Sequence, residues 1–231
     1  MSIADNIARV RENIARAAAE SGRAPSEIKL VGASKMNDAA ACREAIAAGI
    51  DALGENRVQE MTQKLGEHAY DGAPLHFIGH LQRNKVKQVV GKVALSESVG
   101  SLELLAAIDA LSEKLGLVQD ILLEVNIGGE EAKSGFAPED ISAAAERALA
   151  ASHVRVRGLM CIPPVAEDAH ASIPYFEKVR RLYVDIGKNL YHNGFDTLSM
   201  GMSADYEDAV RCGATLVRVG TAIFGKRNYA T

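Results

Sequence analysis

Residues 196–220, DTLSMGMSADYEDAVRCGATLVRVG, contain two short apolar runs separated by an amphipathic segment and a glycine. Each run is nearly continuous in apolar or β-branched side chains, which is typical of parallel strands that are buried on both faces. The amphipathic segment ends at Gly213, and a glycine after a helix takes the left-handed backbone without a Cβ clash. The stretch therefore predicts a strand, a helix and a second strand.

The same pattern recurs along the whole chain. The predicted strands are 29–34, 51–54, 75–79, 93–96, 120–126, 154–160, 196–200 and 215–220. The helical segments between them end at or near Gly49, Gly66, Gly91, Gly116 and Gly213. Eight such units predict an α/β protein with a single (β/α)8 TIM barrel, forming one domain over residues 1–231. A doubly wound open sheet also buries parallel strands, so periodicity does not exclude it, but the strand count favours the barrel.

An extra helix is predicted before the first strand. Ser2 and Asp5 are placed to cap its start reciprocally, and Gly22 and Pro25 end it. Its apolar stripe is formed by Ile3, Ile7, Val10 and Ile14. Packing of this stripe on the barrel accounts for it, so we expect a monomer.

Composition excludes several classes of function. The net charge of −4 argues against a broad nucleic-acid surface, and six Tyr, five Phe and no Trp leave few stacking platforms. No apolar run is long enough to span a bilayer, and the N-terminus lacks the apolar core of a signal peptide. Cys42, Cys161 and Cys212 are scattered and odd in number, which favours a reducing cytoplasm over a disulfide framework.

In a barrel, the chemistry lies where strands end and loops begin. Lys35 directly follows the first predicted strand. Apolar neighbours and helix N-termini ease proton loss from a lysine, which makes its amine a nucleophile for a carbonyl. A solvated lysine at a strand exit is the alternative. Asn56 follows the second strand, where it can bond a ligand or cap a helix.

The loops after the last two strands combine hydroxyls, glycines and backbone N–H groups. The residues concerned are Ser199, Met200, Ser203, Gly220 and Thr221. Barrels often hold phosphate at this position, and two tightly capped turns are the alternative. If the barrel closes, these two loops lie side by side.

Arg218 is a charged residue inside an apolar strand. Strand alternation places it on the same face as Leu216 and Gly220. Because a lone buried charge is costly, Arg218 must face the open mouth or be paired. His76 and His80 lack a third ligand at a usable spacing, so metal binding has little support.

Seven segments carry a resemblance to a known family. They are Lys35, GENRVQE at 54–60, HFIGHLQRNK at 76–85, KSGF at 133–136, GLMCIPP at 158–164, LSMGMSADYEDA at 198–209 and VRVGTAIFGKR at 217–227. In this order across the chain, they resemble the pyridoxal phosphate homeostasis protein family. The resemblance implies a barrel like the N-terminal domain of alanine racemase, holding pyridoxal 5′-phosphate (PLP) as a lysine Schiff base.

The resemblance also implies roles for individual residues. Lys35 matches the Schiff-base lysine, Arg218 the arginine that faces the pyridine nitrogen, and Asn56 a polar residue at the cofactor rim. Ser199, Met200, Ser203, Gly220 and Thr221 fall in the phosphate-binding segments. Lys133 matches a loop lysine suspected in cofactor exchange. Two departures are Met36-Asn37-Asp38 after the lysine, where members often have Thr or Lys-Pro, and a C-terminus without paired lysines.

The implied function is intracellular PLP homeostasis, by buffering the cofactor or delivering it to apo-enzymes, without catalysis. The resemblance also implies that racemases of this barrel type are longer proteins, whose second domain closes the mouth of the barrel. We expect no such second domain here. An open mouth suits holding and release. A PLP-dependent amino-acid racemase is the alternative, and a third reading is another Schiff-base or phosphate-binding barrel.

Overall fold

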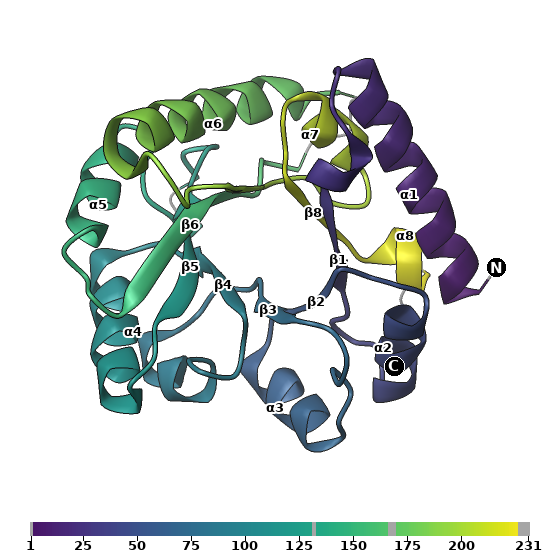
Figure 1. Cartoon of the computed structure of the whole chain (residues 1–231), viewed down its shortest axis with the longest axis horizontal. Helices are drawn as coiled ribbons and strands as arrows, with labels where there is room; N and C mark the ends of the chain where they lie inside the picture. Colours follow the sequence, from purple (N-terminus) through teal and green to yellow (C-terminus); the bar gives the residue numbers. More distant parts are fainter. Residues whose placement is uncertain (1, 131–132, 166–169, 226–231) are drawn as a thin grey trace.

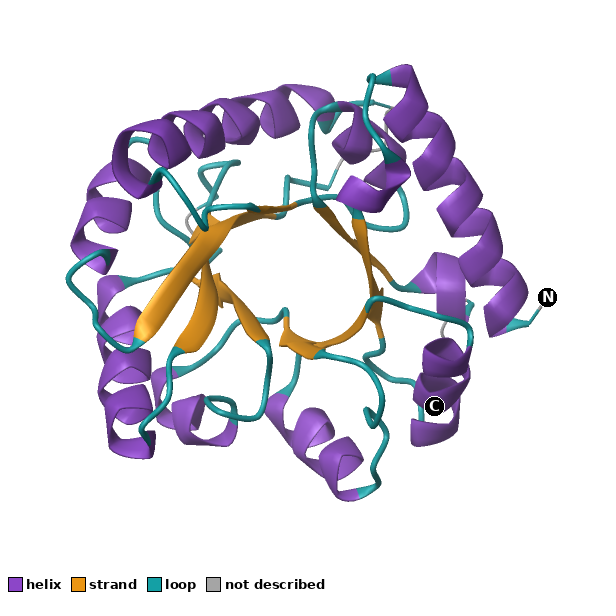
Figure 2. Ribbon diagram, in the orientation of Figure 1, coloured by secondary structure: helices purple, strands orange, loops and turns teal. Residues whose placement is uncertain are grey.

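Eight parallel strands close into a barrel with β8 paired to β1. The computed structural model describes residues 2–130, 133–165 and 170–225. Figure 2 shows the ring of strands at the centre, with helices around it. The closed ring confirms the (β/α)8 prediction and excludes the open doubly wound sheet.

The strands follow one another around the barrel in chain order. They are β1 (Lys29–Ala33), β2 (Ala52–Glu55), β3 (Leu75–Phe77), β4 (Leu95–Val99), β5 (Gln119–Val125), β6 (Val154–Cys161), β7 (Thr197–Ser199) and β8 (Leu216–Val219). The α-helices are α1 (Ile3–Glu20), α2 (Ala39–Ala47), α3 (Val58–Gly66), α4 (Leu102–Leu115), α5 (Ile141–Ala148), α6 (Ile173–Ile186), α7 (Tyr206–Arg211) and α8 (Thr221–Phe224). Three short elements complete the fold: the 3₁₀ helices η1 (Pro25–Glu27) and η2 (Arg83–Gln88) and the π-helix η3 (Gly187–Tyr191).

The extra N-terminal helix is present and begins as predicted. Ser2 and Asp5 form a reciprocal capping box, and Ile7, Val10 and Ile14 are buried. Figure 1 shows α1 outside the barrel, beside α7 and α8. Hydrogen bonds from Asn6 to the Ile223 carbonyl and from Asn13 to the Tyr206 hydroxyl join the helix to these two elements. The apolar stripe is therefore covered within the chain itself.

The fourth strand differs most from its prediction. It runs over Leu95–Val99 instead of 93–96, and all five of its residues are buried. Three of them, Ser96, Glu97 and Ser98, are polar, so a search for apolar runs placed this strand too early. The helix α3 ends at Gly66, as predicted, although the left-handed residue after it is His68 (φ 55°) and not this glycine.

Two apolar cores lie on either side of the sheet. The larger fills the space between strands and helices, and the smaller fills the barrel interior. The interior core consists of Val31, Ala52, Leu95, Leu122, Met160 and Leu216. Two residues further along, on the same faces of β4, β5 and β8, stand Glu97, Glu124 and Arg218. The interior thus changes from apolar to polar toward the strand ends, where a site can form.

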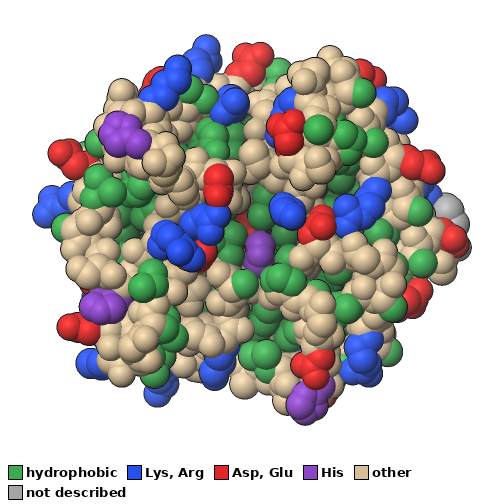
Figure 3. All heavy atoms as spheres, viewed as in Figure 1, with side chains coloured by type: hydrophobic (Ala, Val, Ile, Leu, Met, Phe, Trp, Pro, Cys, Tyr) green, Lys and Arg blue, Asp and Glu red, His purple; other side chains and the backbone are tan. Residues whose placement is uncertain are grey.

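Charges of both signs are interspersed over the face of the molecule drawn in Figure 3. Oppositely charged side chains also form ion pairs, for example Arg155 and Arg157, which both donate to Asp120. In the described ranges, no helix combines the length and apolar character that a membrane crossing requires.

Candidate functional site

A cavity of about 580 Å³ lies at the carboxyl ends of the strands. Its lining residues are Ala33, Lys35, Asn56, Ile78, Gly79, His80, Glu124, Val125, Asn126, Lys133, Ser134, Ile162, Met202 and Arg218. The volume is in the range of small-molecule sites, and apolar walls with a few polar groups are typical of them. Three residues predicted from the sequence, Lys35, Asn56 and Arg218, share this cavity although they come from β1, β2 and β8.

Lys35 occupies a tight turn that follows β1. The turn is closed by the N–H of Asn37, which donates to the Ser34 carbonyl at 3.1 Å. The side-chain amide of Asn37 donates to the backbone carbonyl of Lys35, also at 3.1 Å. Lys35 is half-buried and lines the cavity.

A buried network of hydrogen bonds holds Arg218 in place. Its guanidinium donates to the Ser199 hydroxyl and, at 2.9 Å, to the Cys161 carbonyl. Ser199 donates in turn to Glu97 Oε2 at 2.6 Å, and His76 Nδ1 lies 2.7 Å from Glu97 Oε1. Burial alone would raise the pKa of Glu97, but the hydrogen bond and charge of His76, then the charge of Arg218, hold that pKa below its usual range. Arg218 therefore faces an ionised carboxylate inside the barrel.

Asn56 provides a test of whether the cavity fits a polar ligand. Its side-chain Oδ1 is buried and has no hydrogen-bond partner among the described residues. Buried polar atoms are nearly always paired, so an orphaned one on a cavity wall indicates a missing partner. This unpaired acceptor, together with an amine and a guanidinium on the same cavity, fits a compact polar aromatic ligand such as PLP.

The loops after β7 and β8 lie side by side, as closure of the barrel predicts. Ser203 Oγ accepts from the N–H of Gly220 at 3.1 Å and from that of Ala222 at 3.3 Å. The hydroxyl retains its own proton for donation. Thr221 is exposed at the start of α8, and Met202, from the β7 loop, lines the cavity. The structure thus brings Ser203, Gly220 and Thr221 together beside the cavity.

None of the five residues of the predicted phosphate segments is among the residues that line the cavity, and two of them, Ser199 and Met200, are fully buried. Ser199 is fully buried below the mouth, and its hydroxyl is shared between Arg218 and Glu97. Met200 is fully buried in the outer core, because alternation turns its side chain toward the helices, and its N–H donates to the Leu216 carbonyl. The hydroxyl of Ser199 is thus engaged by Arg218 and Glu97 in this structure.

Two buried carboxylates near the cavity, Glu97 and Glu124, were not predicted from the sequence. Glu124 lines the cavity and accepts from the Ser134 hydroxyl at 2.9 Å. Burial raises the pKa of Glu124, outweighing the opposing effects of Ser134, His80 and Arg218. A signal existed, because both glutamates alternate with interior leucines along their strands, as Arg218 does.

The rim of the cavity carries two further groups considered from the sequence. His80 is exposed and lines the cavity, while Lys133 forms an ion pair with Glu130 in its own loop. Within the described ranges, no three His, Cys, Asp or Glu side chains gather closely enough to hold a metal ion.

The fold and this site define a class of protein, the barrel of the alanine racemase N-terminal domain type. The family model described as "Alanine racemase, N-terminal domain" matches residues 6–228. An alanine racemase of Clostridium difficile has a TM-score of 0.72 at 19% identity, and the match covers 98% of this chain and 58% of that enzyme. At that identity the likeness shows the fold alone.

Closer relatives narrow the class to one family. The pyridoxal phosphate homeostasis protein of Aquifex aeolicus is 42% identical over 229 residues, covering 99% of this chain and 100% of that one. The protein of the same name from Pseudomonas aeruginosa is 43% identical over 231 residues, covering 99% and 97%. The chain belongs to the pyridoxal phosphate homeostasis protein family. PipY of Synechococcus elongatus, solved with PLP bound, superposes with a TM-score of 0.84 at 32% identity, covering 97% of this chain and 100% of PipY.

Proposed function

We propose that this protein holds PLP covalently through Lys35 and takes part in intracellular PLP homeostasis, by buffering the cofactor or delivering it to apo-enzymes. The observation that carries the proposal is the shared cavity of Lys35, Asn56 and Arg218. The relatives of the same length support it, since they are named for PLP homeostasis and one is described with PLP bound.

The aldehyde of PLP supplies one reaction here, condensation with a primary amine, in which a C=N bond replaces C=O and water leaves. Lys35 offers that amine. A guanidinium has N–H donors and no acceptor, so Arg218 would face the ring nitrogen as an obligate donor. A donor at this place favours an unprotonated pyridine, which is a weaker electron sink than the pyridinium that a carboxylate would favour. The residues present thus favour holding over carbanion chemistry.

The phosphate would be held on the β7–β8 side of the cavity. Ser203 would offer its hydroxyl proton, and it is bonded to the backbone of Gly220, next to the exposed Thr221. Lys133, on the rim, would guide exchange of the cofactor through its charge. We assign Asn56 to polar contact with the ring.

A non-catalytic role agrees with what lines the mouth. None of the tyrosines that the structure describes, namely Tyr70, Tyr175, Tyr183, Tyr191 and Tyr206, lines the cavity. Racemases of this barrel type are expected to take an acid–base tyrosine from the partner subunit, and the described part of this chain, which we propose to be a monomer, places none at the cavity. We infer that the protein binds PLP without turnover of its own.

The setting we propose is the cytoplasm, with the barrel and α1 acting as one monomeric domain. Cys42, Cys161 and Cys212 are free thiols, which suits a reducing compartment. The apolar stripe of α1 is buried within the chain and needs no second copy. Neither nucleic acid nor a membrane enters the proposal.

The test is to map the covalent adduct. Purified protein is incubated with PLP, reduced with borohydride, digested and analysed by mass spectrometry. We expect a yellow protein with the label on Lys35, and a colourless Lys35→Ala variant, with Lys133→Ala as the control that stays yellow. A colourless wild type or a label mapped elsewhere would contradict the proposal. α-Proton exchange of amino acids into deuterated water tests the racemase alternative, and rapid exchange with one amino acid would overturn the non-catalytic role.

A further inference from the structure

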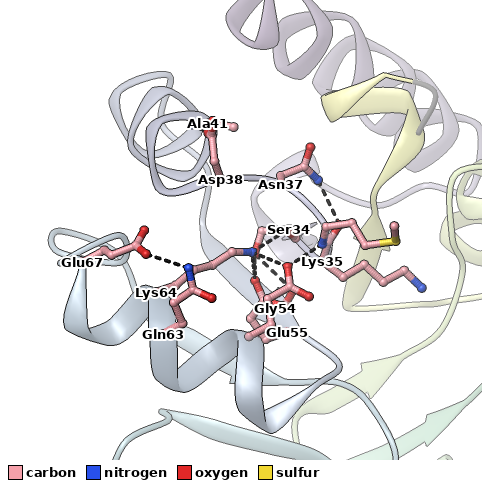
Figure 4. A network of polar contacts seen from close by, with 12 residues as sticks. Ser34, Lys35, Asn37, Asp38, Ala41, Gly54, Glu55, Gln63, Lys64 and Glu67 are labelled. Atoms are coloured by element: carbon pink, nitrogen blue, oxygen red, sulfur yellow. Dashed lines mark hydrogen bonds and ion pairs between the residues drawn. The ribbon is translucent and has the colours of Figure 1, made fainter. Parts of the chain in front are cut away.

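A second polar cluster lies behind Lys35, between β2, α3 and the turn after β1 (Figure 4). At its centre is Lys64, only 4% exposed. Its Nζ donates to Glu55 Oε1 and Glu60 Oε1, both at 2.7 Å, and to the Ser34 carbonyl at 2.8 Å. An ammonium group has three N–H donors, so all of them are used. Burial opposes the charge of Lys64, but the hydrogen bonds to Glu55 and Glu60 outweigh it and raise the Lys64 pKa.

The cluster is attached to the backbone on both sides of Lys35. The Ser34 carbonyl, bonded to Lys64, belongs to the peptide unit before Lys35. The N–H of Met36, in the peptide unit after Lys35, donates to Glu60 Oε1 at 2.5 Å. Because peptide units are planar, fixing both units fixes φ and ψ of Lys35, and with them the direction of its Cα–Cβ bond. Figure 4 shows the side chain of Lys35 leaving the turn on the side away from Lys64.

The turn would not hold this shape unaided. Met36 is its third residue and has φ 62°, a left-handed conformation that glycine or asparagine usually supplies at this place. Such a backbone persists in a larger residue only where its surroundings over-determine it. The bond from the Met36 N–H to Glu60 is one such constraint, and Glu60 is itself held by Lys64.

The make-up of the cluster also suggests a role beyond packing. Glu55 is fully buried, and its Oε2 has no hydrogen-bond partner among the described residues. Burial raises the pKa of Glu55 despite the hydrogen bonds from Lys64 and Ser34. A buried ion cluster is weak support for stability, because apolar residues of similar volume serve as well or better. Buried charges and unpaired buried polar atoms that stability does not explain are expected at functional sites.

We propose that Glu60 and Lys64 are positioning residues, which clamp the peptide units on both sides of Lys35 and so aim its amine into the cavity. The inference rests on the proposed function, in which that amine captures the aldehyde of PLP. Neither residue lines the cavity, so both act through Lys35 and not on the ligand.

The test compares two ligands on matched variants of Glu60. PLP can link to Lys35, whereas pyridoxine 5′-phosphate has an alcohol in place of the aldehyde and cannot. Glu60→Leu removes the acceptor for the Met36 N–H, Glu60→Gln keeps an acceptor oxygen, and Gln59→Leu alters an exposed residue of the same helix. Glu60→Ala, which leaves Glu55 and Ser34 on Lys64, is a second truncation in case the bulkier leucine impairs folding.

We expect Glu60→Leu and Glu60→Ala to weaken PLP binding roughly tenfold, the loss typical of one hydrogen bond to a charged group. Pyridoxine 5′-phosphate affinity should change by less than about twofold, and Glu60→Gln and Gln59→Leu should resemble wild type. Equal weakening of both ligands, or no weakening of PLP, would overturn the positioning role while wild-type binding stands. A wild type that binds no PLP contradicts the proposed function itself and this inference with it.

Discussion

Arg218 and Glu97 face each other inside the barrel, with Nη1 of the arginine 3.7 Å from Oε2 of the glutamate. Ser199 bridges them, accepting from Arg218 and donating to Glu97. Both charges are almost fully buried, at 3% and 0% exposed, and a lone charge at such a depth would be costly. The carboxylate thus makes a fixed guanidinium tolerable in the wall of the cavity.

Ser199→Ala should lower the free energy of unfolding by about 1–3 kcal/mol, because it leaves buried groups of Arg218 and Glu97 unsatisfied. The matched control is Ser96→Ala, also in a barrel strand and buried. Ser96 Oγ has no partner among the described residues, so its removal should be neutral or slightly stabilising. Urea denaturation of the two variants checks this. Equal losses in both would show that the Ser199 bridge contributes nothing specific.

Gly79→Ala should damage the mouth of the barrel. A Cβ at Gly79 would lie 2.2 Å from the carbonyl oxygen of Asn56 and 2.5 Å from its Cα, so the two loops must separate. We expect a loss of about 1–3 kcal/mol in unfolding free energy, the usual cost of overpacking. PLP affinity should fall as well, because Asn56 lines the cavity.

Gly66→Ala is the control for that substitution. Gly66 is the last residue of α3, and a Cβ there meets no atom within 4 Å among the residues described. Alanine should be neutral or stabilise the helix by up to about 1 kcal/mol. Thermal unfolding and PLP titration of both variants separate the outcomes, and a Gly79→Ala protein as stable as Gly66→Ala would refute the predicted clash.

Glu124→Gln should change how stability depends on pH. Burial raises the pKa of Glu124, so the folded state prefers the protonated acid. This group's contribution is fully present below the unfolded carboxyl pKa of about 4.3 and is lost as pH rises through the higher folded value. Glutamine stays neutral, so the stability of the variant relative to wild type should rise between about pH 4 and pH 8. Denaturation curves at both pH values test this, and a constant difference would contradict it.

Lys64→Met should destabilise the protein by about 3–5 kcal/mol, because it leaves Glu55 buried without its cation. The exposed Lys87 offers a control, since Lys87→Met should change the unfolding free energy by no more than about 0.5 kcal/mol. Calorimetry measures both. A Lys64→Met protein with wild-type stability would mean that Glu55 is not ionised in the fold.

Strand positions were predictable wherever apolar alternation continued. The strand containing Arg218 was located correctly, and the argument that its charge must face the mouth or be paired is confirmed on both counts. Glu97 is likewise a charged residue that is buried and paired inside the barrel, and its strand extends beyond Ser96 to Val99. That strand was misplaced because Ser96, Glu97 and Ser98 interrupt the apolar run, although all three are buried and Glu97 pairs with Arg218 inside the barrel.

Short-range sequence patterns determined the repeating units, the capped first helix and the placement of Lys35, Asn56 and Arg218 at strand ends. Each of these features depends only on residues a few positions away in the sequence. Only the tertiary structure decided that the Ser199 hydroxyl accepts a hydrogen bond from Arg218, and that Lys64 bonds the Ser34 carbonyl behind the turn of Lys35. Both depend on pairs 19 and 30 residues apart in sequence. The first pair meets because β7 pairs with β8, and the second because β2, which precedes α3, pairs with β1. The position of a residue along a strand determines which face of the sheet its side chain lies on. Barrel closure and strand register determine which partner it meets on that face.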